Sequence, residues 1–114
     1  MPTDIPEKII AVGGYAVIFS SSRTDTENES YRETAERMLS LAAQQPGFLG
    51  VESVRETTGD GITVSYWSDL ASIEAWKNNA EHRVARQHGR EHWYQSFNVR
   101  ICKIEKEYTF NENT

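Results

Sequence analysis

The sequence predicts a single α+β domain whose elements follow the order β-α-β-β-α-β. Three observations predict it: runs of alternating side chains that are typical of strands, two segments with helical spacing of apolar residues, and a length of 114 residues, which suits one domain. This is the ferredoxin-like order, in which an antiparallel sheet carries its helices on one face.

The first half of the chain supplies a strand, a helix and a second strand. Residues 15–21 alternate, with apolar side chains on both faces. Residues 28–45 carry apolar side chains at helical spacing, and Thr26 followed by Glu29 has the spacing of a capping box. A Pro-Gly pair ends this helix, and residues 48–56 form the second strand.

The third strand covers residues 61–67, after a turn rich in glycine and threonine. Along it Ile62, Val64 and Tyr66 face one way, and Trp67 faces the other with two small polar residues, a threonine and Ser65. Because small side chains leave room beside Trp67, we expect this face of the strand to line a cavity.

A second helical region and a long last strand complete the order. Ser68 or Asp69 can cap the region, and Asn78 with Glu81 has the spacing of a second capping box. We therefore expect the helix to break near Asn79 and to restart, running to about Tyr94. The last strand is predicted over residues 97–109, with its charged far half pairing with a second subunit.

Three segments are expected along the chain: an N-terminal arm over residues 1–12, the domain over residues 13–110 and a frayed tail over residues 111–114. The first, third and last strands carry apolar residues on both faces, so the face without helices also needs a cover. A second copy packed sheet against sheet would supply it, which predicts a homodimer.

Composition excludes several classes of protein. A formal net charge of -5 disfavours nucleic-acid binding, which needs a basic surface. The single cysteine, Cys102, forms no internal disulfide and fits a reducing compartment. The N-terminal residues lack the pattern of a signal peptide, and no apolar run approaches the length that spans a bilayer. We therefore expect a cytoplasmic protein with neither nucleic-acid nor membrane partners.

Residues 65–97 hold all three tryptophans and all three histidines, so a pocket is expected there. His82 or His88 is a candidate general base, because imidazole titrates near neutral pH. Arg86 is a candidate for holding a carboxylate, phenolate or propionate, although a solvated ion pair explains it as well. His88 and His92 have the i, i+4 spacing of metal ligands, but two histidines are an incomplete set, so no metal is predicted.

Certain residues in this order resemble the antibiotic biosynthesis monooxygenase-like family. The resemblance covers residues 15–108 and is carried by the segment Gln45-Pro46-Gly47-Phe48-Leu49-Gly50, by Tyr66-Trp67 at the end of the third strand, and by Trp76 with Glu81-His82. It implies a dimeric α+β barrel, a homodimer whose pockets lie between sheet and helices. Some members oxidise polycyclic aromatic molecules with dioxygen and without a metal or organic cofactor.

Other members of the family bind and degrade haem. They use an Asn on the first strand, a Trp at the end of the third strand and an axial His on the last helix. Trp67 matches the Trp, Ser20 and Ser21 stand near the place of the Asn, and a count from Trp76 reaches Arg86, two residues before His88.

Three hypotheses follow. The first is an oxidoreductase of the monooxygenase type that oxidises a small flat aromatic molecule without a cofactor. The second is a haem-binding or haem-degrading protein with His82 or His88 as the iron ligand, and the third is a binding module without catalysis. For the first, His82 and His88 are the candidate catalytic residues, and the predicted substrate-binding residues are Trp67, Ser65, Tyr66, Arg86 and Trp76.

Overall fold

The computed structural model describes residues 9–110 and residue 112. This part of the chain has the predicted order β-α-β-β-α-β, with the second helical region divided in two. The elements are β1 (Tyr15–Arg23), α1 (Asn28–Ala42), β2 (Phe48–Arg55), β3 (Asp60–Trp67), α2 (Leu70–Lys77), α3 (Ala80–His88), a π-helical turn η1 (Gly89–Trp93) and β4 (Tyr94–Lys103). None of the helices described is long and apolar enough to cross a membrane.

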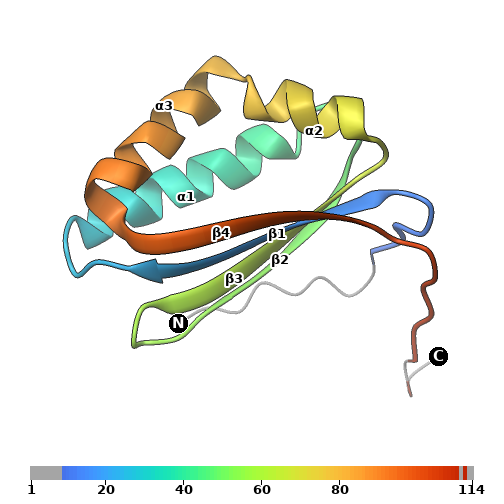
Figure 1. Ribbon diagram of the computed structural model, residues 1–114, viewed down its shortest axis with the longest axis horizontal. Helices are drawn as coiled ribbons and strands as arrows, with labels where there is room; N and C mark the ends of the chain where they lie inside the picture. Colours follow the sequence, from blue (N-terminus) through green and yellow to red (C-terminus); the bar gives the residue numbers. More distant parts are fainter. Residues whose placement is uncertain (1–8, 111, 113–114) are drawn as a thin grey trace.

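The four strands form one antiparallel sheet in the order β2-β3-β1-β4. All three α-helices lie over the same face of this sheet, and in the described chain no helix covers the other face (Figure 1). The predicted α+β class and ferredoxin-like order are therefore confirmed.

The register of β1 and β3 shows which side chains face the helices. Tyr15 lies opposite Trp67 and Val17 opposite Ser65, so these side chains share one face. Trp67 forms the buried core of this face together with Ala42 from α1 and Ile73 from α2. The predicted alternation of β3 is thus observed, with Trp67 toward the helices.

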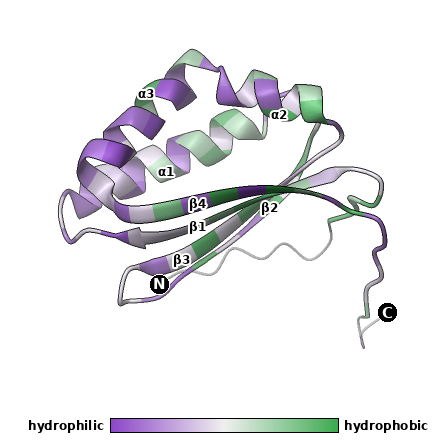
Figure 2. Ribbon diagram, viewed as in Figure 1, coloured by the Kyte–Doolittle hydropathy of each residue, from purple (hydrophilic) through white to green (hydrophobic). Residues whose placement is uncertain are grey.

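The opposite face of the sheet carries apolar side chains that are open to solvent in the single chain. Ile18 lies opposite Val64, and Val54 opposite Ile62. Val54 is 39% exposed and Ile62 is 51% exposed. Figure 2 shows hydrophobic segments on the strands as well as on the helices. Such exposed apolar side chains are typical of a surface that packs against another protein surface.

The start of α1 differs from the predicted capping box. Glu27 takes the N-cap position in the left-handed conformation, with φ 54° and ψ 40°, and its side chain makes no capping bond. Thr26 instead donates its hydroxyl hydrogen to the backbone carbonyl of His92 at 2.9 Å. A tertiary contact has therefore replaced the local cap.

The break between α2 and α3 lies where the sequence predicted it, but the cap differs by one residue. The side-chain oxygen of Asn79 accepts hydrogen bonds from the amides of Glu81 and His82 at 3.0 and 3.1 Å. Asn79, and not Asn78, therefore caps α3. Asp69 caps α2, accepting from the Ser72 amide at 2.7 Å.

The last strand begins and ends earlier than predicted, at Tyr94 and Lys103. Tyr94 joins it because its ring packs edge-on against Phe19 on the neighbouring strand, with the ring centroids 5.3 Å apart. Beyond Lys103, the Glu107 carboxylate accepts the amides of Ala11 and Val12, both at 2.8 Å. Most of the predicted arm, residues 1–8, and the predicted tail apart from Glu112 lie outside the described residues.

Candidate functional site

Trp67 is fully buried, with 0% of its surface exposed. The ring of Phe48 meets it edge-on at a centroid distance of 5.4 Å, and the ring of Trp76 stacks on it at 6.3 Å. The indole N–H of Trp67 donates to the hydroxyl oxygen of Ser65 at 2.9 Å. Side chains therefore fill the space where the sequence predicted a cavity.

His82 extends this aromatic stack. Its imidazole lies parallel to Trp76, with centroids 4.2 Å apart and planes 10° apart, and its Nδ1 is 3.1 Å from the Trp76 carbonyl oxygen. Burial lowers the pKa of His82 below its usual 6.5, and the nearby Arg86 charge lowers it further, against the opposing effect of the hydrogen bond. The packed environment thus favours the neutral form of His82.

Two other predicted residues lie apart from this stack. The guanidinium of Arg86 donates to the carbonyl of Lys77 at 2.8 Å, and so ties α3 to the end of α2. Tyr66 lies on the opposite face of the sheet, where its hydroxyl donates to the Glu52 carboxylate. Burial, and then the Glu52 carboxylate, raise the pKa of Tyr66 to about 12. Tyr66 and Trp67 therefore do not line one pocket of the same chain.

A groove of about 350 Å³ lies between α1 and α3. It is thus bounded by two helices, whereas the sequence predicted a pocket between helices and sheet. Arg37 of α1 and Glu81 of α3 form an ion pair at 2.6 Å on its wall. We call it the α1–α3 groove; its lining residues are Ser30, Glu33, Thr34, Arg37, Met38, Glu81, Val84, Ala85, His88 and Trp93.

Trp93 lines the α1–α3 groove and carries an unusual buried polar group. The residue is 5% exposed, and its indole N–H has no hydrogen-bond partner among the residues that the structure describes. A buried N–H without a partner costs about 1–3 kcal/mol. Because this nitrogen is itself buried, a ligand in the groove would reach the hydrogen only after the ring or its neighbours move.

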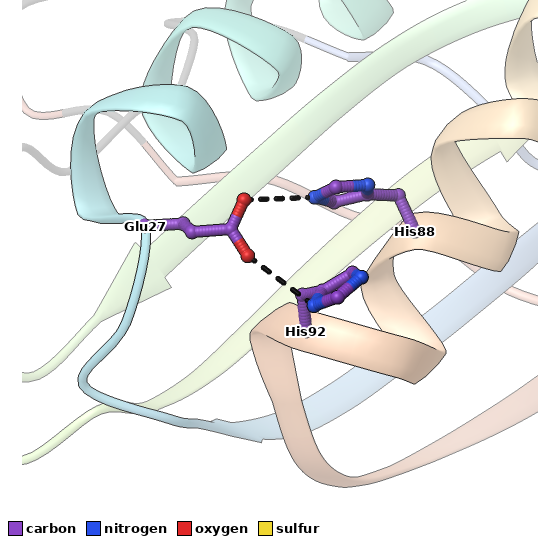
Figure 3. A group of neighbouring side chains, drawn as sticks. All are labelled: Glu27, His88 and His92. Atoms are coloured by element: carbon purple, nitrogen blue, oxygen red, sulfur yellow. Dashed lines mark hydrogen bonds and ion pairs between the residues drawn. The ribbon is translucent and has the colours of Figure 1, made fainter.

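His88 lines the same groove and belongs to a cluster with Glu27 and His92. His88 Nε2 is 3.1 Å from Glu27 Oε1, and His92 Nδ1 is 3.4 Å from Glu27 Oε2. Figure 3 shows the Glu27 carboxylate facing both imidazoles, with one oxygen toward each; the two rings come from the end of α3 and from η1. The His88 ring also lies 4.5 Å from the ring of Trp93, so the cluster adjoins the groove.

Hydrogen bonds between two distant segments hold this cluster together. Thr24 and Thr26 donate to the carbonyl of His92 at 2.8 and 2.9 Å. The buried Arg23 side chain donates to the carbonyl of Trp93 at 2.8 Å, and its guanidinium lies 3.9 Å from the centre of the Tyr31 ring. The loop that carries Glu27 is therefore fixed against the turn that carries His92.

Sequence reasoning identified His88 and its i, i+4 neighbour but missed the other two members of the site. Glu27 is 61 positions from His88, and no local spacing connects them. Trp93 packs edge-on against Tyr31, with the ring centroids 5.6 Å apart. The sequence carries no signal for its unpartnered N–H.

Comparison with known proteins adds the family. Residues 15–88 match the family model described as antibiotic biosynthesis monooxygenase. Among curated proteins, YqjZ of Bacillus subtilis is 55% identical over 100 residues, which cover 88% of this chain and 87% of YqjZ. The jasmonate monooxygenase ABM of Pyricularia oryzae is 24% identical over 102 residues, and these span 86% of this chain and 46% of that protein.

Solved structures share the fold at low sequence identity. SnoaB from Streptomyces nogalater, described as a cofactor-independent oxygenase, is 11% identical with a TM-score of 0.72, covering 84% of this chain and 97% of SnoaB. Rv0793 from Mycobacterium tuberculosis is 11% identical with a TM-score of 0.74, covering 84% of this chain and 99% of that one. At this identity the likeness concerns the fold.

Proposed function

Because the chain belongs to the antibiotic biosynthesis monooxygenase family, we propose that it is a monooxygenase that oxidises a small flat aromatic molecule with dioxygen and without a bound cofactor. The description of SnoaB as a cofactor-independent oxygenase supports this proposal. We place the substrate in the α1–α3 groove. The observation that carries this placement is that Trp93 and His88 line one groove with their ring centroids 4.5 Å apart, and that the buried indole N–H of Trp93 has no partner among the described residues.

The proposed substrate has an acidic methylene group next to aromatic rings and a carbonyl oxygen. A base removes a proton from the methylene carbon, and the carbanion reduces dioxygen to form a hydroperoxide at that carbon. Loss of water then leaves a carbonyl. The carbon loses two hydrogens and gains one oxygen atom, and the second oxygen atom leaves as water. The substrate thus supplies all four electrons, so no other reductant is needed.

His88 is the proposed base. When its Nε2–H donates to Glu27, the other ring nitrogen is left as the proton acceptor, and the carboxylate stabilises the imidazolium that forms. Trp93 donates its indole N–H to the carbonyl oxygen, on which negative charge develops after deprotonation. The alternative base, His82, is less suited because its ring is stacked on Trp76 and its Nδ1 faces a backbone carbonyl.

The predicted substrate-binding residues take a supporting role in this proposal. Trp67 and Ser65 of β3 pack together with Trp76 of α2, and Arg86 holds α3 in place. We also propose a homodimer formed through the open sheet face. The exposed side chains of Val54 and Ile62 support it, since burying them would remove apolar surface from water.

The haem hypothesis does not fit the described residues. Trp67 is enclosed by Phe48 and Trp76, so it presents no surface to a porphyrin. The His82 ring is stacked on Trp76, and its Nδ1 faces the Trp76 carbonyl. When haemin is titrated with the protein, we therefore expect its Soret band to stay that of free haemin.

Turnover of anthrone, a tricyclic ketone with an acidic methylene, tests the proposed function in an oxygen electrode. We expect one dioxygen consumed per anthrone, about a 100-fold lower kcat in Trp93→Phe, and a similar loss in His88→Asn. Tyr108→Phe, at an aromatic residue that is 95% exposed, is the control and keeps the parent rate. A larger loss in His82→Asn than in His88→Asn would assign the base to His82. Absence of enzyme-dependent oxygen uptake with anthrone and with related phenolic methylene compounds would favour the non-catalytic binding module.

A further inference from the structure

We propose that Glu27, His88 and His92 together bind one divalent transition-metal ion, of which Zn²⁺ fits the ligand set best. The inference goes beyond the proposed oxidation, which uses no metal. The sequence predicted none because two histidines are an incomplete set. The structure adds a carboxylate from a loop that precedes α1, and so brings the number of protein ligands to three.

The distances suit coordination to one ion. One ligand atom from each residue, imidazole nitrogen or carboxylate oxygen, lies within 4.8 Å of the others. Glu27 oxygens are 3.1 Å from His88 Nε2 and 3.4 Å from His92 Nδ1. Two ligand atoms bound at about 2.1 Å to a tetrahedral zinc ion lie about 3.4 Å apart. Small side-chain rotations would thus place an ion between the three groups.

The backbone that presents the ligands is unusual on both sides. Glu27 has φ 54°, the one positive φ among the described residues other than glycine. His92 lies in the π-helical turn η1, in which the Tyr94 amide bonds to the Gly89 carbonyl. This turn places the rings of His88 and His92 with their centroids 4.5 Å apart. Strained backbone conformations and π-helical turns are frequent at functional sites.

The surroundings of the cluster fit a cation. His92 Nε2, the ring nitrogen that does not face Glu27, is 3.7 Å from the Glu91 carboxylate. Metal-bound histidines commonly direct their second nitrogen at a carboxylate, which fixes the ring and strengthens the ligand. The hydrogen bonds of Thr24 and Thr26 to the His92 carbonyl already join the two segments. Binding of the ion would therefore cost these segments little further conformational entropy.

The ligand set distinguishes among metals. Two imidazoles with one carboxylate and an open position are typical of zinc and of other first-row transition metals. Mg²⁺ and Ca²⁺ prefer oxygen ligands, so they are expected to bind poorly. A bound ion would occupy His88, which then cannot act as a base. Binding of the ion and turnover are therefore predicted to exclude each other.

Calorimetric titration of the untagged full chain with Zn²⁺ tests the site without reference to activity. We expect one ion per chain, and at least a tenfold weaker affinity in both Glu27→Gln and His92→Gln. Glu29→Gln, which removes an exposed carboxylate of the first turn of α1, is the matched control and keeps the parent affinity. Circular dichroism of each variant establishes that it is folded.

Cobalt substitution supplies a second readout. Co²⁺ bound by two imidazoles and a carboxylate gives visible d–d absorption, and this absorption should be lost in His88→Gln. Equal Zn²⁺ affinity in Glu27→Gln and Glu29→Gln, or the absence of saturable binding to the parent protein, would overturn the proposal. Neither result depends on whether the protein oxidises anthrone, so failure of the metal site and failure of the oxidation are distinguishable.

Discussion

The indole N–H of Trp67 donates a hydrogen bond of 2.9 Å to the hydroxyl of Ser65, two positions earlier on the same strand and on the same face. Ser65→Ala removes the acceptor and leaves a buried N–H without a partner. We expect this to lower the free energy of unfolding by about 1–3 kcal/mol, measured by urea denaturation. In a Trp67→Phe background the same substitution should cost almost nothing, since no N–H remains to be satisfied. Equal costs in the two backgrounds would contradict this role for Ser65.

The cap of α3 can be assigned with two neighbouring asparagines. Asn79→Ala removes the oxygen that accepts from two helix amides, and should lower stability by about 0.5–2 kcal/mol. Asn78→Ala, one residue earlier, leaves that cap intact and is expected to have a much smaller effect. Denaturation midpoints of the two variants make the comparison. A larger loss of stability in Asn78→Ala than in Asn79→Ala would contradict this assignment and would favour Asn78, the cap that the sequence predicted.

His82 makes stability depend on pH. Burial holds its folded-state pKa below the usual 6.5, so below that pH the unfolded chain binds a proton that the folded chain does not. Stability is therefore expected to fall as pH decreases through 6.5 toward the lower folded-state pKa. In His82→Phe, which keeps a ring against Trp76, this part of the pH dependence should disappear. Urea midpoints measured at pH 7.5 and pH 5.5 for both proteins provide the test. The same difference between the two midpoints in the variant as in the parent would contradict this role for His82.

Tyr66 should ionise at unusually high pH. Burial and the Glu52 carboxylate raise its pKa to about 12 from a usual 10.0. Phenolate absorbance, compared between the parent and Tyr66→Phe, should identify one tyrosine that titrates near that value. Glu52→Gln removes the negative charge and should lower the pKa. In the unfolded chain Tyr66 loses its proton near pH 10, whereas in the folded chain it keeps the proton to higher pH. The free energy of unfolding is therefore expected to decline as pH rises above 10. A Tyr66 that ionises normally would contradict the hydrogen bond to Glu52.

Local patterns predicted much of this fold. The alternation along β1 and β3 assigned side chains to the correct faces, because a strand has a side-chain period of two whatever packs against it. The break near Asn79 was also predictable, since helix caps depend on neighbouring residues. The face opposite the helices was expected to pack on a second copy, and this stays a prediction, as does the cytoplasmic location.

The site was less predictable, because tertiary contacts determine it. Small residues on β3 indicated free space beside Trp67, but Phe48 and Trp76 from other segments fill that space. Thr26 had the spacing of a helix cap, yet its hydroxyl bonds to His92, 66 positions away. The same long-range contact brings Glu27 to the histidines. Such contacts leave no pattern in a single sequence.

Labelled dioxygen gives the most direct test of the central claim, that this chain inserts one oxygen atom into a flat aromatic substrate using residues of the α1–α3 groove. Anthrone is incubated with the protein under ¹⁸O₂, and the product is analysed by mass spectrometry. The account predicts one ¹⁸O atom in the new carbonyl, at a rate that falls about 100-fold in Trp93→Phe. A carbonyl oxygen derived from water, or equal rates of labelling in the parent and in Trp93→Phe, would contradict it.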